Sequence, residues 1–127
     1  MANFVWASKK PIDDIATIYE SNITLNKSAS SYFETAYVVL LGLDRESLQI
    51  AVRPASKEDV SLGFIPEEQQ HNITVKPSYS RICNKQFVQE VAMLIGLQFD
   101  EKQGHKFRAT WNHKENALII DLSHREG

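Results

Sequence analysis

Residues 36–53 read AYVVLLGLDRESLQIAVR, and this stretch decides the fold class. Its first part, 36–41, is a run of aromatic, β-branched and aliphatic residues, which is typical of a strand. The polar residues DRES at 44–47 form a turn, and apolar residues then alternate with polar ones over 48–53, the period of a half-buried strand. Pro54 ends that strand, because proline cannot donate to a sheet ladder. The stretch therefore predicts a β-hairpin.

The residues before this hairpin predict a shorter hairpin followed by a short helix. Segment 16–25 reads ATIYESNITL, which is two β-prone runs on either side of the turn signal ESN. Asn26 is a good helix cap, so a helix is expected over 27–33. Three residues of that helix are expected to face a core: Ala29, Tyr32 and Phe33. The first half of the chain thus has the order β-β-α-β-β.

The second half repeats this order. Strands are expected at 72–76 and 80–83, after which Asn84 begins a helix that Gly96 ends. The apolar residues of this helix recur at helical spacing on one face: Phe87, Val91, Leu94 and Ile95. A closing hairpin is expected, with strands at 106–111 and 117–122 around the turn NHKEN.

Segment 57–70, KEDVSLGFIPEEQQ, separates the two halves and is called the connector below. It holds one basic and four acidic residues, together with Gly63 and Pro66, and this composition is typical of a solvated linker. We therefore predict one domain over 1–127, with a first unit at 12–56 and a second at 71–123. The fold class is β-rich α+β, in which two β-β-α-β-β units form one barrel-like body.

The repeat resembles a known family when the halves are aligned at Asn26-Lys27 and Asn84-Lys85. Segment 17–27 (TIYESNITLNK) and the hairpin 37–53 resemble the swapped-hairpin domain of the AbrB and MazE type, and 80–85 (SRICNK) is a looser copy of the same motif. Two such units intertwine in that family to form one barrel. The resemblance implies a pseudo-dimeric swapped-hairpin barrel duplicated within one chain, and a regulator of transcription that binds DNA.

The expected DNA-binding residues are Lys27, Arg81 and Lys85. Lys27 and Lys85 occupy matching positions at the two helix starts, where a pseudo-dimer would bring them to one face, and clustered cations are what phosphate contacts require. Asn22 and Ser80 stand where DNA-binding members of the family carry arginine or glycine-arginine. The alternative is a protein-interaction or assembly module that binds a protein partner or itself and has no nucleic-acid role.

Composition and motifs argue against several other classes. The net charge of −2 excludes a generally basic nucleic-acid binder. The four histidines lack metal-ligand spacing, and no nucleophile or phosphate-loop motif is present, so we expect no metal, no cofactor and no enzyme activity. Cys83, the single cysteine, is expected to be buried and inert on its strand. A single cysteine cannot form an internal disulfide, which favours a cytoplasmic protein. No apolar run approaches the ~20 residues of a membrane span, so we expect no membrane partner.

Overall fold

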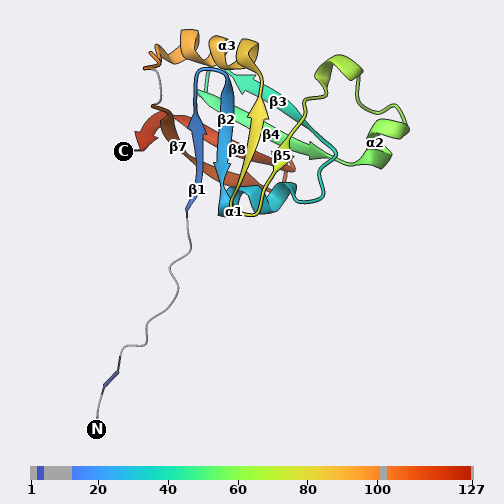
Figure 1. Cartoon of the computed structure of the whole chain (residues 1–127), viewed down its shortest axis with the longest axis horizontal. Coiled ribbons are helices and arrows are strands. Elements are labelled where there is room, and N and C mark those ends of the chain that lie inside the picture. The colour runs from blue at the N-terminus through green and yellow to red at the C-terminus, as the bar shows by residue number, and fades with distance from the viewer. Residues whose placement is uncertain (1–2, 5–12, 101–102, 127) are drawn as a thin grey trace.

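The computed structural model describes residues 3–4, 13–100 and 103–126 and contains one antiparallel sheet with few helices. Its eight strands are β1 (Asp14–Ile18), β2 (Asn22–Asn26), β3 (Val38–Asp44), β4 (Gln49–Ala55), β5 (Thr74–Val75), β6 (Tyr79–Cys83), β7 (His105–Asn112) and β8 (Ala117–Glu126). The helices are α1 (Lys27–Ser30), α2 (Lys57–Ser61) and α3 (Lys85–Ile95), with short 3-10 helices η1 (Ser31–Phe33) and η2 (Glu67–Gln69). The sheet curls into a half-barrel (Figure 1), which confirms the β-rich class.

The strands follow the order β3-β4-β8-β7-β1-β2-β6-β5, and all neighbours are antiparallel. Within each half of the chain, successive strands pair as hairpins. Between the halves, β4 pairs with β8, β7 with β1, and β2 with β6. A single isolated bridge joins Val39 of β3 to His71, which lies just before β5. Each half therefore completes its sheet by pairing with strands of the other half.

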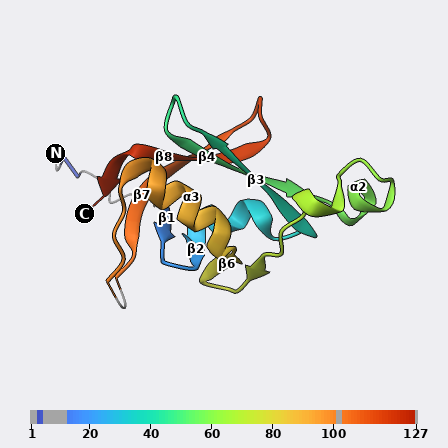
Figure 2. The same cartoon turned by 90° about the horizontal axis from the view of Figure 1, so that it is seen from above.

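The core lies inside the curl of the sheet. Successive strand residues point to opposite faces, so the alternating apolar residues of the strands meet on the inner face. The largest side chains buried there are Phe33, Phe107, Ile18, Ile23, Leu25, Ile50, Ile82, Leu118 and Ile120. Helices α1 and α3 lie toward opposite ends of the β2·β6 pair in Figure 1, and Figure 2 shows α3 lying across the opening of the curl.

Helix α3 begins and ends where the sequence predicts, but its buried face is different. Asn84 caps it by accepting a hydrogen bond from the backbone N–H of Phe87 at 3.0 Å, and Gly96 ends it with a φ of 70°. Val91 is buried as expected, whereas Phe87 and its other predicted neighbours are only half-buried. Val88, which was not predicted, is the second buried side chain of this helix. Tyr32 was likewise expected in the core and is exposed instead.

Three further predictions are corrected. Pro54 does not end its strand: β4 continues to Ala55, because Pro54 lies opposite Val39, whose backbone groups bond to His71, so the ladder needs no donor at this position. Cys83 is exposed rather than buried, because Ile82 beside it points into the core and neighbouring residues of a strand face opposite ways. The alignment of Leu25 with Cys83 therefore joins an inward residue to an outward one. The connector contains α2 in addition to loop, and α2 begins in a capping box between Ser56 and Asp59.

The two long hairpins have turns of the same geometry. In β3-β4, Oδ1 of Asp44 accepts hydrogen bonds from the N–H groups of the second and third residues after it, at 3.0 and 3.1 Å. In β7-β8, Oδ1 of Asn112 does the same at 2.9 and 3.1 Å. Both turns then place a residue at positive φ, 56° at Leu48 and 51° at Asn116. Matching backbone geometry in the two turns gives the two hairpins the same register.

Candidate functional site

The three predicted DNA-binding residues lie along one pair of strands but do not form a compact cluster. Lys27 follows the last residue of β2, and Lys85 lies just beyond the end of β6. Because β2 and β6 are antiparallel, these two lysines lie past opposite ends of the pair, roughly 15 Å or more apart at about 3.4 Å per residue. Arg81 lies between them, opposite Thr24. All three side chains are exposed.

Arg81 stands over an aromatic neighbour in a shallow hollow. Its guanidinium carbon is 5.5 Å from the centroid of the Tyr79 ring, within cation–π range. Tyr19, Asn22 and Thr24 complete a hollow of about 390 Å³ around the pair. The ion pairs that the structure records in its described part involve Arg53 and Arg108, and none of the three predicted cations takes part.

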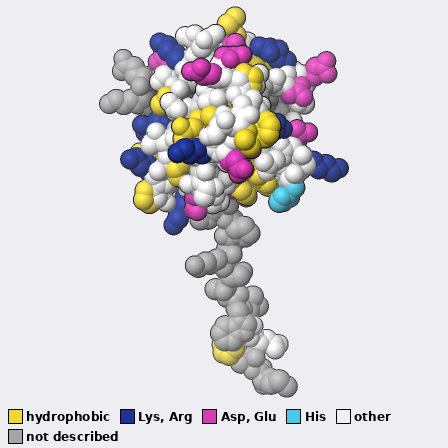
Figure 3. Space-filling view, turned by 90° about the vertical axis from the view of Figure 1, so that its right-hand side faces the viewer, with side chains coloured by type: hydrophobic (Ala, Val, Ile, Leu, Met, Phe, Trp, Pro, Cys, Tyr) yellow, Lys and Arg dark blue, Asp and Glu magenta, His cyan; other side chains and the backbone are white. Residues whose placement is uncertain are grey.

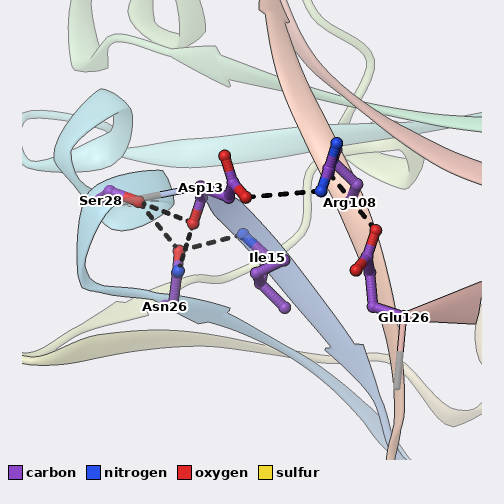
Figure 4. A network of polar contacts seen from close by, with 6 residues as sticks. All are labelled: Asp13, Ile15, Asn26, Ser28, Arg108 and Glu126. Atoms are coloured by element: carbon purple, nitrogen blue, oxygen red, sulfur yellow. Dashed lines mark hydrogen bonds and ion pairs between the residues drawn. The ribbon is translucent and has the colours of Figure 1, made fainter. Parts of the chain in front are cut away.

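The region where α1 meets β1 is held by a polar network (Figure 4). Oδ1 of Asn26 accepts hydrogen bonds from the backbone N–H groups of Ala29 and Ile15 at 3.1 and 3.2 Å, and Nδ2 donates to the carbonyl of Asp13 at 2.7 Å. The guanidinium of Arg108 lies 3.4 Å from carboxylate oxygens of Asp13 and Glu126. Arg108 is thus neutralised by two carboxylates, which makes it a poor phosphate ligand.

A groove of about 970 Å³ lies between the tips of the two long hairpins, which stand apart in Figure 2. Its floor is a row of successive cross-strand partners: Gly42, Ala51, Ile119 and Thr110. Polar groups of the two turns, among them Asp44 and His113, form the rim. The groove thus has a floor of mostly small or aliphatic residues and a polar rim.

Trp111, at the border of this groove, turns its side chain to the opposite, inner face of the sheet and belongs to an aromatic cluster there. Its indole stacks on Tyr32 with centroids 4.7 Å apart and planes 9° apart, and Phe33 meets it edge-on at 6.5 Å. Partial burial raises the pKa of the Tyr32 hydroxyl above its ordinary value, and the nearby carboxylate of Asp14 raises it further. The cluster therefore fixes the Trp111 ring against η1.

The connector carries two of the large apolar side chains that are exposed on the described surface. Leu62 is 59% exposed and Phe64 is 71% exposed, and α2 has no buried residue. Both cartoon views show α2 standing apart from the sheet (Figures 1 and 2). Figure 3 views the molecule from the right-hand side of Figure 1, the side on which α2 lies, and this face mixes acidic, basic and hydrophobic side chains. The composition of the connector predicts a plain solvated linker, and its large apolar residues were the one sequence feature that did not fit this prediction.

The described residues contain neither a metal-ligating cluster nor a membrane-spanning helix. No group of three or more His, Cys, Asp and Glu side chains there is placed to hold a metal ion. No helix in the described ranges combines the length and the apolar character needed to cross a bilayer. Comparison of the chain with family models, with curated proteins and with solved structures found no match.

Proposed function

We propose that this chain is a non-catalytic interaction module that binds a partner protein through the connector. The observation that carries the proposal is the exposure of Leu62 and Phe64 on a segment that projects from the sheet. Exposed apolar side chains scattered singly are ordinary, whereas two large ones only two residues apart on a projecting element favour a contact site. Aromatic residues such as Phe64 are enriched at the centre of protein interfaces.

The charge around these side chains specifies the chemistry of the partner. The connector carries four acidic residues and one basic residue, so Leu62 and Phe64 are surrounded by negative charge. The matching surface is an apolar pocket with a rim of lysine or arginine side chains. Rim charges act mainly on the association rate, so salt should slow binding more than it speeds dissociation.

Phe64→Ser tests this proposal, with Met93→Ser as the matched control. Met93 is 87% exposed on α3, so the control removes an apolar side chain of similar exposure from another surface. A partner captured by the wild-type protein is purified, and its dissociation constant is measured directly. We expect Phe64→Ser to weaken binding by tenfold or more, which is about 1.4 kcal/mol, and Met93→Ser to leave it unchanged. Equal binding by both variants and the wild type would reject the proposal.

DNA binding is the second candidate, favoured by exposed cations on the β2·β6 pair and just past its two ends. Lys27, Arg81 and Lys85 are exposed, and the recorded ion pairs of the described residues leave them out. If the AbrB-like interpretation holds, mixed duplex DNA binds at ~50 mM salt, and each phosphate contact contributes about one unit to the log–log salt slope. Lys27→Ala with Lys85→Ala then lowers the slope by ~2. The control pair Lys57→Ala with Lys114→Ala, also exposed, leaves it unchanged.

We also infer that the fold is a duplicated β-β-α-β-β unit of the swapped-hairpin kind. The Val39–His71 bridge joins the β3 edge to the residue before β5 and so closes the strand order into a cycle. If each strand of the first half is replaced by its equivalent in the second half (β1 by β5, β2 by β6, and so on) and the reverse, every neighbour in this cycle stays the same. The β4·β8 register is symmetric about the pair Ala51 and Ile119, which are equivalent positions of the two hairpins. Exchanging the turn sequences 44–48 and 112–116 tests the inference. Retained stability supports it, and loss of the fold counts against it.

A further inference from the structure

The two edges of the sheet are built differently. The β5 edge has only two residues, Thr74 and Val75, and Lys76-Pro77 follows at once. Short length, lysine and proline are the features by which proteins prevent a sheet edge from pairing with another chain. The β3 edge has seven residues, and Val38–Leu43 contains no charge and no proline. The protein thus protects one edge and leaves the other open.

The bridge at Val39 shows which backbone groups of β3 face outward. Val39 donates its N–H to the carbonyl of His71 and accepts the N–H of His71, both at 2.9 Å. Backbone groups alternate between the two sides of an antiparallel strand, so those of Leu41 and Leu43 point to the same outer edge. β3 is the terminal strand of the sheet, and beyond Val39 no strand of the described chain pairs with that edge. The open part is therefore Leu40–Asp44.

We propose that this edge pairs with the β3 edge of a second copy of the chain, antiparallel and centred on Gly42. In this register Leu41 exchanges backbone hydrogen bonds with Leu43 of the second copy, and Leu43 does so with Leu41. Gly42 faces its own counterpart, so no side chain obstructs the approach at the symmetry axis. His71 at one end and the turn at Asp44 at the other limit the ladder to five residues.

A second copy fits this edge better than a charged peptide does. The segment is uncharged up to Asp44, so an identical strand brings no like charge into the ladder except at its ends. The half-buried side chains of Leu41 and Leu43 pack against the core and continue the apolar inner face across the junction. A ladder of five residues buries less than the roughly 1,600 Å² of a stable interface, so we expect a dimer that dissociates at concentrations on the order of 10–100 µM.

Leu41→Pro is the direct test, because it removes an outward N–H that has no ladder partner within the chain. Leu41→Ala is its control, since it trims the side chain and keeps the N–H. Sedimentation equilibrium is expected to show that the wild-type protein and Leu41→Ala both form dimers. For Leu41→Pro the dissociation constant of the dimer should rise roughly tenfold or more, since each dimer loses two backbone donors. Circular dichroism checks that the variants are folded.

A second pair of variants tests the register and remains informative if Leu41→Pro does not fold. Leu40 is half-buried and faces away from the core, and in the proposed ladder it lies opposite Asp44 of the second copy. Leu40→Asp then places like charges together and weakens the dimer, whereas Leu40→Lys forms an opposite-charge pair and strengthens it. Within one chain the order is reversed, because Leu40 pairs with Arg53 on β4. A dimer effect therefore cannot be mistaken for a folding effect.

Three outcomes would overturn the proposal. They are a wild-type protein that is monomeric at millimolar concentration, an Leu41→Pro variant that dimerises as well as wild type, and equal dimerisation of Leu40→Asp and Leu40→Lys. If the amides of Leu41 and Leu43 gain protection from hydrogen exchange only when another protein is added, the edge serves that partner and the second-copy assignment is wrong. Phe64→Ser should leave dimerisation unchanged, so this test and that of the connector fail independently.

Discussion

The buried hydroxyls of Ser30 and Ser80 allow a quantitative test of how the two halves are joined. Ser30 of α1 and Ser80 of β6 are 4% and 0% exposed, and their Oγ atoms are 2.8 Å apart. Oγ of Ser30 also lies 2.8 Å from the carbonyl oxygen of Asn26. Each hydroxyl has one proton, so the consistent arrangement is that Ser80 donates to Ser30, which donates to Asn26.

The two single substitutions therefore have unequal costs. Ser80→Ala removes one hydrogen bond and leaves Ser30 bonded to its carbonyl, at a cost of about 1 kcal/mol in the free energy of unfolding. Ser30→Ala removes the bond to Asn26 and also leaves the Ser80 hydroxyl buried without its partner, at a cost of about 2–3 kcal/mol. The double variant has no orphaned hydroxyl, so we expect it to cost about 1–2 kcal/mol, less than Ser30→Ala alone.

Urea denaturation of the four proteins measures these values, with equal m-values as the check that the same surface is exposed on unfolding. The coupling energy between the two sites should be about 1–2 kcal/mol. Costs that add within about 0.3 kcal/mol would refute the proposed donor chain. So would a Ser80→Ala variant that costs more than Ser30→Ala.

The remaining predictions concern the fold, the exposed thiol and one turn. Fragments 1–58 and 70–127 should each be unfolded alone and should fold when mixed, because β4, β7 and β2 pair with strands of the other half. Circular dichroism measures this, and two fragments that are each stably folded as monomers would contradict it. Cys83 is exposed, so a thiol reagent should modify it in the native protein nearly as fast as in urea, and strong native protection would be the contrary result. Asp44→Asn should preserve stability at pH 7, since Asn112 makes the same contacts in the other turn. Hydrogen bonds from Ser47 and then Glu46 lower the pKa of Asp44, so its contribution is present above its unfolded pKa and lost as pH falls through the folded pKa. The melting temperature of wild type should therefore fall more between pH 5 and about pH 2 than that of Asp44→Asn, and equal falls would argue against it.

Local patterns predicted the elements well because the signals are themselves local. The alternation in 48–53, the cap Asn84 and the stop Gly96 each depend on neighbouring residues, and all three appear as expected. The same alternation could have placed Cys83 correctly, since Ile82 beside it is the residue that a core would take. The error lay in assigning a burial state from residue type instead of from strand period.

The strand partners and the site could not be predicted in the same way. Nothing in the sequence of β4 specifies β8 as its neighbour, because an apolar inner face is compatible with any strand that has the same pattern. The position of Lys27 relative to Lys85 depends on that pairing, which places them past opposite ends of β2·β6. Leu62 and Phe64 are of the residue types that fill cores, and only the fold, in which α2 stands apart from the sheet, explains why they face solvent.

The central position of β8 has a consequence for how the chain is made. β8 lies between β4 and β7, and it is the last of the eight strands to leave the ribosome. Until it emerges, the β3-β4 hairpin has no sheet neighbour except the bridge at His71, and its apolar face stays open. The sheet cannot be completed progressively from its N-terminal end, and its closure depends on contacts between residues far apart in sequence, which makes folding slow. A nascent chain of this protein therefore presents the open edge and apolar face of β4 until β8 is released, and its yield in a cell should depend on chaperones that hold this segment until then.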